Sequence, residues 1–374
     1  MSDPRLTRLV ASLPATVPFV GPETQERARF RPFAARLGAN ESGFGPSPRA
    51  VAAMQDAAAE AWKYGDSESH DLRRALADHH GVPPEAILIG EGIDGLLGNL
   101  VRLLVAPGDG VVTSDGAYPT FTYHVAGFGG VVHKVPYAGD REDPDALIAR
   151  TRETGAKLVY LSNPDNPMGS WLGADRVAAM IAGVPDHALM ILDEAYADFA
   201  PDGAIPPMDA TERRVIRMRT FSKAHGLAGL RIGYAIAHPD LIAVFHRIRN
   251  HFGITRLAQA AALASLDDAT HLADVVAKAA AARARIGEIA AENGLTPLPS
   301  ATNFVAVDCR GDGALARAVL AGLTERDVFA RMPAVAPLDR CIRISCGPEA
   351  ELDVLARALP PALAEARARA AAAT

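Results

Sequence analysis

The sequence predicts an α/β protein in which a large domain holds a mainly parallel seven-stranded sheet and a smaller C-terminal domain is α+β. Between residues 85 and 240, short β-rich runs alternate with helical patterns, an order typical of a parallel sheet covered by helices. The runs also lack alternation of polar and apolar residues, as expected for strands buried on both faces. The seven predicted strands span residues 86–90, 110–113, 131–135, 157–161, 188–192, 215–220 and 231–237.

The segments on either side of the sheet region complete a three-part organisation. We expect an N-terminal arm at residues 1–35, a large domain at 36–265 and a small C-terminal domain at 266–374. The arm is rich in Pro and Arg with weak periodicity, which favours an extended conformation. Ser47 and Pro48 predict the start of the first helix of the large domain, because serine caps a helix and proline suits its first turn.

One long helix is predicted to lead into the small domain. Residues 255–293 are rich in Ala and Leu, which favours a single helix over the whole segment. Beyond it we expect a small domain of strands and helices that ends in a fraying helical tail. The predicted strands span residues 303–307 and 341–345, the predicted helices 313–323 and 349–358, and the tail 360–374.

Length, composition and charge restrict the kind of protein. With 374 residues, of which 49% are apolar and 22% charged, the chain can bury a core in more than one domain. Its formal net charge of −6 argues against a nucleic-acid surface, and no apolar run approaches the ~20 residues of a membrane span. The three cysteines and the histidines form no disulfide, zinc or other metal pattern, so we expect no metal. The expected location is the cytoplasm.

The strongest local signal for chemistry surrounds Lys223. A β-rich run ends in Ser222 and Lys223, a glycine-punctuated segment follows, and Arg231 comes eight residues after the lysine. Burial lowers the pKa of a lysine, so that its neutral amine can condense with an aldehyde. The serine hydroxyl and the arginine fork suit a phosphate. Taken alone, a Ser-Lys pair is more often an ion-paired lysine at an ordinary strand end.

Two further buried strands each end in a polar group. The run 157–161 leads into an Asn-Pro-Asp-Asn-Pro turn, whose prolines can hold the amide of Asn166 toward a ligand. The run 188–192 delivers Asp193 to the same edge of the sheet, with Tyr196 three residues on. A buried carboxylate needs a cationic partner, and a protonated pyridine nitrogen is one. The alternatives are a polar turn at the asparagine and a helix N-cap at the aspartate.

A glycine-rich turn follows the first predicted strand, with Gly92, Ile93 and Asp94 at its centre. Glycines let backbone N–H groups approach a phosphate at the N-terminus of the next helix. The turn has a Gly-x-Gly-x-x-Gly spacing, but it lies beyond the first helices. It also has no convincing acidic residue at the end of the next strand, which disfavours a dehydrogenase. Such turns are also common for packing reasons alone.

Together and in this order, these segments resemble the fold-type I aminotransferases of the aspartate aminotransferase superfamily, and among them the histidinol-phosphate aminotransferase branch. Residues 37–48, LGANESGFGPSP, and residues 63–66, KYGD, are similar to two further segments of that branch. The resemblance runs from about residue 18 to 348 and implies the pyridoxal 5′-phosphate-dependent transferase fold. It implies ping-pong transamination between an amino acid and 2-oxoglutarate, with histidinol phosphate or an aromatic amino acid as donor.

The resemblance also implies a role for each matching residue at the cofactor. Lys223 forms the Schiff base with pyridoxal 5′-phosphate and later moves the proton, while Asp193 pairs with the pyridinium nitrogen. Asn166 and Tyr196 hydrogen-bond the 3′-oxygen of the ring, and Phe121 stacks on its face. The phosphate is held by Gly92, Ile93, Asp94, Ser222 and Arg231, and by Tyr64 of a neighbouring subunit, which implies a homodimer with shared active sites.

For the substrate, the resemblance implies that Arg343 binds the α-carboxylate and Arg331 a second anionic group, with Asn40 and Phe19 nearby. Phe19 stands where that branch usually has a tyrosine, so one hydroxyl donor is lost. An alternative keeps the cofactor but leads to decarboxylation or elimination, as in the related threonine-phosphate decarboxylases. A ligand-sensing module without catalysis is disfavoured, because no basic DNA-binding extension precedes the arm.

Overall fold

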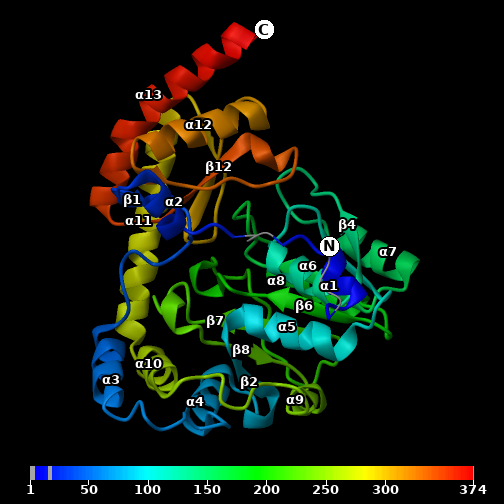
Figure 1. The fold of residues 1–374 in the computed structure, drawn as a ribbon. Helices are drawn as coiled ribbons and strands as arrows, with labels where there is room; N and C mark the ends of the chain where they lie inside the picture. Colours follow the sequence, from blue (N-terminus) through cyan, green and yellow to red (C-terminus); the bar gives the residue numbers. More distant parts are fainter. Residues whose placement is uncertain (1–4, 16–18, 374) are drawn as a thin grey trace.

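The computed structural model describes residues 5–15 and 19–373, and a seven-stranded sheet lies at the centre of its large domain (Figure 1). The strand order is β2-β8-β7-β6-β5-β3-β4, in which β8 runs antiparallel to both of its neighbours and the other pairs are parallel. This confirms the predicted mainly parallel sheet, and each predicted run overlaps one strand. The strands are β2 (Ile87–Gly90), β3 (Gly110–Ser114), β4 (Val131–Val135), β5 (Leu158–Ser162), β6 (Leu189–Asp193), β7 (Val215–Thr220) and β8 (Gly233–Ile236).

Helices cover both faces of this sheet, as the uninterrupted apolar strands predict. In β5, Tyr160 belongs to a core cluster with α5 and α6, whereas Leu161 belongs to a cluster with α7 and α8 on the opposite face. The helices of the large domain are α3 (Pro48–Ala58), α4 (His70–His80), α5 (Gly92–Leu104), α6 (Pro119–Gly127), α7 (Pro144–Thr154), α8 (Ala174–Gly183), α9 (Pro239–Phe245) and α10 (Arg256–Leu266). Short 3₁₀ turns lie at η1 (Pro84–Ala86), η2 (Ala197–Phe199), η3 (Ala228–Leu230) and η4 (Leu338–Arg340).

The predicted single helix over residues 255–293 is wrong, because the segment forms α10 and a separate helix, α11 (Ala269–Glu292). Asp267 ends the first helix and Asp268 caps the second, since the Asp268 carboxylate accepts a hydrogen bond from the N–H of His271 at 3.2 Å. The same carboxylate accepts a hydrogen bond from Ser47, the cap of α3. From this break α11 rises into the small domain (Figure 1). The boundary after residue 265 stays a prediction.

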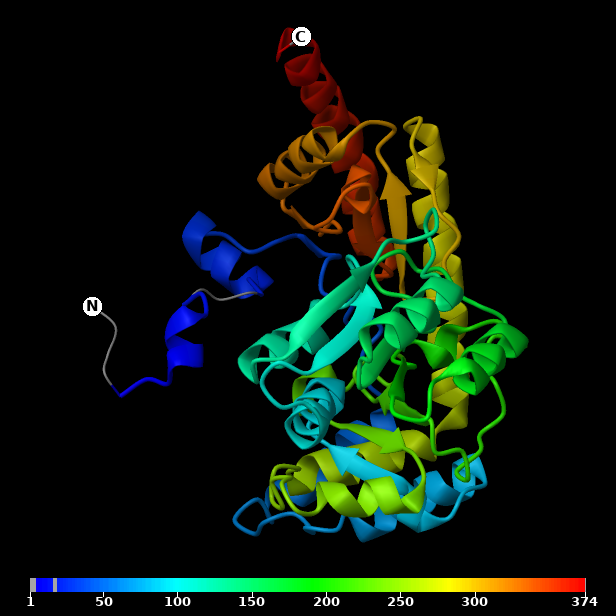
Figure 2. The same cartoon turned by 90° about the vertical axis from the view of Figure 1, so that its right-hand side faces the viewer.

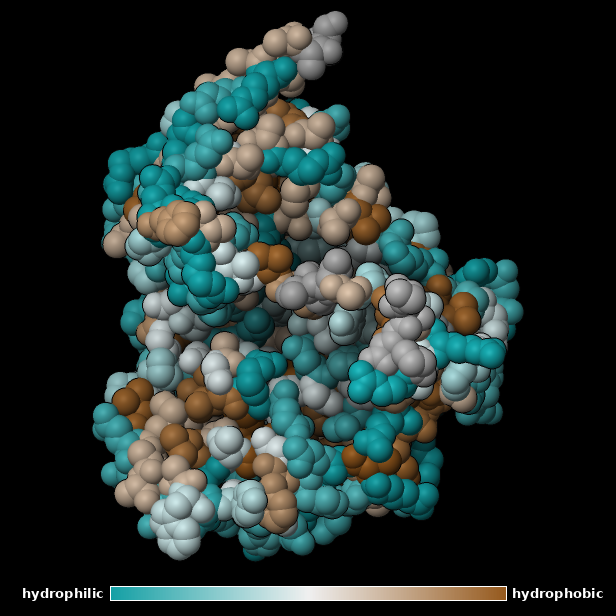
Figure 3. Space-filling model, in the orientation of Figure 1, coloured by the Kyte–Doolittle hydropathy of each residue, from teal (hydrophilic) through white to brown (hydrophobic). Residues whose placement is uncertain are grey.

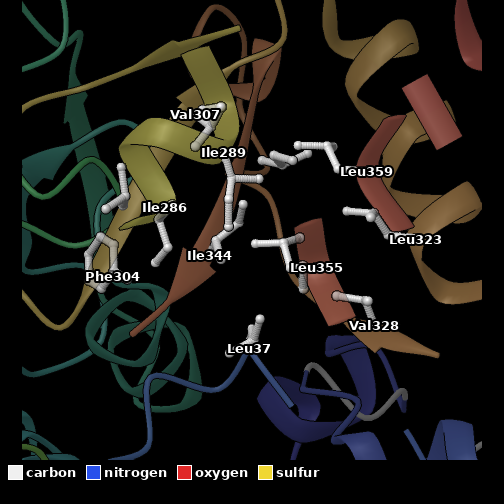
Figure 4. Close-up of a cluster of buried hydrophobic side chains, with 14 of the residues drawn as sticks. Leu37, Ile286, Ile289, Phe304, Val307, Leu323, Val328, Ile344, Leu355 and Leu359 are labelled. Carbon is white, nitrogen blue, oxygen red and sulfur yellow. The ribbon is translucent and has the colours of Figure 1, made fainter. Parts of the chain in front are cut away.

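The small domain packs three helices around an antiparallel sheet of order β12-β10-β9. Its core joins side chains from α11, both long strands and the two C-terminal helices, and Figure 4 shows Ile289, Ile344 and Leu355 grouped in this core. A two-stranded parallel pair, β1 with β11, brings the start of the large domain against it. The remaining elements are β1 (Ala35–Arg36), β9 (Thr296–Pro297), β10 (Phe304–Asp308), α12 (Gly313–Glu325), β11 (Val328–Phe329), β12 (Cys341–Ser345) and α13 (Glu349–Ala373).

The C-terminal helix continues through two prolines instead of ending before them. Pro360 and Pro361 lie inside α13, which stands clear of the domain only at its last turns (Figure 2). An apolar stripe that includes Ala362 runs on past the prolines and packs on α12. At Gly322 of α12 the two helices approach so closely that an added Cβ would lie 2.9 Å from the Cβ of Ala362. This packing holds the helix together beyond the predicted end at residue 358.

The N-terminal arm is not simply extended, since it contains α1 (Arg8–Ser12) and α2 (Pro22–Arg29). Arg29 and Arg31 form ion pairs with Asp327 of the small domain, the second at 2.8 Å. These contacts fasten the arm beside β11, which begins at the residue after Asp327. Among the helices described, none is long and apolar enough to cross a membrane. The described residues also contain no group of three His, Cys, Asp or Glu that could hold a metal ion.

We expect Leu355→Ala to destabilise the chain by about 2–5 kcal/mol, because Leu355 is fully buried in the core of the small domain and its truncation leaves a cavity. The urea-unfolding midpoint measures the loss. Arg357→Ala, on the exposed face of the same helix, is the control and should change the midpoint little. Equal midpoints for the two variants would contradict the packing described.

Candidate active site

A cavity of about 790 Å³ opens between the large and small domains, at the carboxyl edge of the parallel strands. Figure 3 shows the surface hollowed between these two parts. Most of the residues predicted for the site line this cavity, although they come from distant parts of the chain. They are Phe19, Asn40, Ile93, Asp94, Asn166, Asp193, Tyr196, Ser222, Lys223, Arg231, Arg331 and Arg343.

Lys223 enters the cavity just after β7 ends at Thr220. Its Nζ donates a hydrogen bond to the carbonyl oxygen of Asn40 at 3.2 Å, and it lies 5.7 Å from the centre of the Tyr196 ring. Burial lowers the pKa of the amine to about 8, and the positive charge of Arg343 adds to the effect. Near neutral pH, more of the protein molecules therefore have this lysine as a neutral amine, the form that acts as a nucleophile, than if its pKa were unshifted.

Asp193 and Glu194 are adjacent buried acids, but only Glu194 has cationic partners in the chain. Burial acts to raise the pKa of Glu194, but Arg219 and Arg217 outweigh it and the pKa is lowered. Asp193 receives hydrogen bonds from the Tyr160 hydroxyl at 2.6 Å and from a backbone N–H, and forms no salt bridge within the described chain. Burial raises its pKa to about 6. Of the two carboxylates, Asp193 is the one that a cationic ligand would stabilise.

The opposite end of the cavity gathers groups that suit a phosphate. The guanidinium of Arg231 donates to the hydroxyl of Ser222 at 3.3 Å and pairs with Asp94 at 3.4 Å. Gly92 begins α5 with a positive φ of 73°, and a Cβ there would lie 2.7 Å from Arg231 Nη2. The positive φ favours glycine at this position, and the short approach shows that the arginine lies against the helix N-terminus.

A chain of hydrogen bonds connects four polar residues that line the cavity. The Asn40 and Asn166 amides both donate to the hydroxyl of Tyr196, at 3.0 and 3.4 Å. Arg343 donates through one guanidinium nitrogen to the side-chain oxygen of Asn166. Its Nε is buried and has no hydrogen-bond partner among the residues described. Arg343 therefore keeps a donor for a ligand anion.

The second predicted anion-binding arginine lies beside the first. Arg331 and Arg343 exchange backbone hydrogen bonds, at 3.2 and 2.6 Å, which places both on one wall. The guanidinium of Arg331 donates to the carbonyl oxygen of Val20 in the arm at 2.8 Å. Phe19, the residue before Val20, lines the same cavity and is 40% exposed. The arm therefore forms part of the cavity wall.

Phe121 is one of the predicted site residues that are not among those lining the cavity. It is fully buried and stacks on Tyr160, with ring centres 5.2 Å apart. Tyr118, at the start of α6, lines the cavity instead and donates to Asp94 at 3.0 Å. Both aromatic residues flank the same Pro-Thr pair, but Phe121 lies one helical turn further on and faces the core. The prediction did not name Tyr118, which lies four residues beyond the carboxyl end of β3.

Tyr64 lies away from the cavity of its own chain. It is 76% exposed, and its ring contacts Phe252 with centres 4.7 Å apart. Trp62 is 79% exposed nearby in the sequence. The predicted role for Tyr64 in a neighbouring subunit is not tested by a single chain and stays a prediction.

The mainly parallel sheet, the buried aspartate without a salt bridge and the lysine after the next strand are the features of the aspartate aminotransferase-like class of enzymes. The family comparison assigns the chain to the same class. The model of the family described as aminotransferase class I and II matches residues 35–359, and the chain belongs to this family.

Within the family, the chain is similar to histidinol-phosphate aminotransferases. It is 38% identical to histidinol-phosphate aminotransferase 1 of Mesorhizobium japonicum, over 87% of this chain and 89% of that protein. A solved structure of histidinol-phosphate aminotransferase from Sinorhizobium meliloti, in complex with pyridoxal-5′-phosphate, has 55% identity and a TM-score of 0.94, covering 97% and 99% of the two chains. L-threonine-O-3-phosphate decarboxylase of Porphyromonas gingivalis shares the fold, with a TM-score of 0.75 and 20% identity over 88% and 99%.

The Lys223 amine should titrate with a pKa of about 8 in the chain without ligand. Competitive acylation at a series of pH values, followed by mass spectrometry of the Lys223 peptide, measures this pKa. In Arg343→Met it should rise, because a neighbouring positive charge that disfavours the ammonium is removed. A value near the ordinary lysine pKa of about 10.4 in both proteins would contradict the assigned environment.

Proposed function

We propose that the chain is a pyridoxal 5′-phosphate-dependent transaminase that moves the amino group of histidinol phosphate to 2-oxoglutarate. The observation that carries the proposal is the shared cavity of Lys223 and Asp193, a nucleophilic amine and a buried acid without a charged partner. The similarity to histidinol-phosphate aminotransferases over most of the chain supports the reaction and the donor.

The donor set of the cavity fits pyridoxal 5′-phosphate at each end. Asp193 would hold the ring nitrogen, and Asn166 with Tyr196 the ring oxygen. Ser222 and Arg231 with the N-terminus of α5 would hold the phosphate, since they offer a hydroxyl, a guanidinium and backbone N–H groups. When bound, this cofactor supplies an electron sink for the negative charge that develops at the substrate Cα.

The chain's own groups then bind and position the substrate. Lys223 Nζ removes the proton from the substrate Cα and returns a proton on the way to product, a task suited to an amine whose pKa is about 8. Asp193 keeps the ring nitrogen protonated, because a buried carboxylate favours a cation beside it. Arg343 and Arg331 bind the anionic ends of donor and acceptor from one wall.

The side of the cavity formed by the N-terminal arm indicates which amino donors fit. Phe19 offers an aromatic face without a hydroxyl, and Arg331 holds the arm through Val20. An anionic phosphate near this arginine and an imidazole near the phenyl ring match these two surfaces in charge and polarity. Aromatic amino acids, with a ring but no phosphate, are the second class of donor that the wall accommodates.

We further propose a homodimer in which each subunit completes the site of the other. The exposed aromatic side chains of Trp62, Tyr64 and Phe252 support this, because large exposed aromatic residues are typical of interfaces. In this arrangement the Tyr64 hydroxyl reaches the phosphate of the neighbouring site.

The activity is tested by a donor screen with the purified chain and pyridoxal 5′-phosphate. Histidinol phosphate, phenylalanine, tyrosine and histidine are compared with 2-oxoglutarate as acceptor, and kcat/KM is measured from glutamate formation. We expect histidinol phosphate to give the highest kcat/KM. Lys223→Ala should lose about 10²–10⁴-fold from the missing base alone, whereas Lys278→Ala, at an exposed ion pair, should not. Release of CO₂ from phenylalanine, tyrosine or histidine in place of glutamate formation would establish the decarboxylase alternative.

Tyr118→Ala should weaken pyridoxal 5′-phosphate binding by about 0.5–1.5 kcal/mol, because we assign the contact with the ring face to this residue. Phe121→Ala should instead lower the stability of the chain by about 3–5 kcal/mol, because Phe121 lies in the core. Cofactor titration and urea unfolding of both variants separate the two effects. The assignment is wrong if Phe121→Ala weakens binding more than Tyr118→Ala does.

A further inference from the structure

Two acids that the proposed reaction does not use lie buried behind the cavity wall. Glu142 follows β4 and is 3% exposed, and Asp165, in the turn after β5, is 2% exposed. Neither forms a salt bridge with any residue that the structure describes. Two carboxylates in such a place would both be desolvated and would repel each other.

A single serine hydroxyl joins the two acids. Ser162 Oγ lies 3.1 Å from an oxygen of Glu142 and 3.3 Å from an oxygen of Asp165. Having one proton, it can donate to only one of them at a time. The same oxygen also accepts the backbone N–H of Asn166 at 3.4 Å. The acids are thus connected to the turn that presents the Asn166 amide to the cavity.

The other partners of the two acids indicate where a proton resides. Asp165 faces the Tyr137 hydroxyl at 2.9 Å and the backbone N–H of Met168 at 3.0 Å, and the N–H can only donate. Glu142 Oε2 lies 2.6 Å from the hydroxyl of Ser114, which can accept as well as donate. A proton on Glu142 Oε2 therefore has an acceptor. On Asp165, a proton on Oδ2 would meet a donor, and one on Oδ1 would displace the hydrogen bonds that the Tyr137 and Ser162 hydroxyls donate there.

The charged and titratable groups around the pair do not replace that proton. Arg343, on the small-domain side, lowers the pKa of Asp165, but burial prevails and raises it. Burial and then repulsion from Asp165 raise the pKa of Glu142. The remaining neighbours are phenols, which burial keeps neutral by raising their pKa; they are Tyr137, Tyr160 and Tyr196.

We propose that Glu142 and Asp165 carry one proton between them at neutral pH, held on Glu142 and donated to Ser114, and that they act as a positioning pair for the turn of Asn166. The protonated acid leaves Asp165 as a single buried anion, which accepts the hydrogen bonds that close the turn. Loss of the proton would place a second negative charge behind Asn166. The consequence for cofactor binding rests on the proposed function; the state of the pair does not.

The sign of the pH effect follows from the raised pKa of Glu142. In the unfolded chain this acid is ionised above its ordinary pKa of about 4.3. The folded chain keeps the proton, so its stability is greatest at low pH and falls as the pH rises through the folded pKa. Glu142→Gln imitates the protonated acid, since its amide can donate to Ser114 and its oxygen can accept from the Ser162 N–H. The variant should lack this dependence.

The first test is infrared spectroscopy of the full-length protein at pH 7, with and without added pyridoxal 5′-phosphate. The wild type should have a band of a protonated carboxyl group that is missing in Glu142→Gln and present in Glu153→Gln, which alters an exposed glutamate on α7. Carbon-13 labelling of the glutamate carboxyl groups should shift this band. The labelling needs no variant, so it decides the matter even if Glu142→Gln does not fold. A band that persists in Glu142→Gln, or that does not shift, overturns the proposal.

The second test compares pH profiles. Between pH 5 and 8 the unfolding constant of the wild type should rise more steeply than that of Glu142→Gln, by up to about tenfold per pH unit. The affinity for pyridoxal 5′-phosphate should also fall more steeply with pH in the wild type. Parallel stability profiles would contradict the shared proton, and parallel affinity profiles would contradict the positioning role. A chain that binds no cofactor at any pH would defeat the proposed function, while the infrared result would still stand.

Discussion

Lys223 lies mostly buried at the carboxyl edge of the sheet, where water does little to stabilise its charge and two arginines oppose it. A buried ammonium costs free energy unless charged or polar groups surround it, and the same holds for the other charged groups of the cavity. Each of these groups either has an oppositely charged partner in the chain or could take one from a ligand. Asp94 pairs with Arg231, and the carbonyl oxygen of Asn40 accepts from the lysine. Electrostatics and not apolar packing therefore determines which residues this cavity requires.

The same constraint separates acids that stabilise the fold from acids that are available to a ligand. Glu194 is neutralised by two arginines under the sheet edge, while its neighbour Asp193 has only a hydroxyl and an N–H as partners. Because successive residues of a strand point to opposite faces, one strand end supplies both kinds of acid. A buried acid marks a binding site only when its cation is absent from the protein itself.

Much of this arrangement could be predicted from the sequence, because strand ends are visible in it. Apolar runs located all seven strands, and parallel strands bring Asn166, Asp193 and Lys223 to one edge. Which of Tyr118 and Phe121 lines the cavity depends on which side of α6 faces the core. The residue types alone do not reveal that orientation. The break before α11 depended on a single capping aspartate, Asp268, which resembles any exposed polar residue. The contact between Glu142 and Asp165 joins two loops and has no local pattern at all.

Asn40 has a further consequence for how the two domains communicate. Its backbone N–H donates to Ser345 of the small domain at 3.0 Å, its amide donates to Tyr196 of the large domain, and its carbonyl oxygen accepts from Lys223. One residue therefore ties both domains to the reactive amine. A change in the position of Ser345 relative to Tyr196 would therefore also alter the hydrogen bond that Asn40 accepts from the lysine.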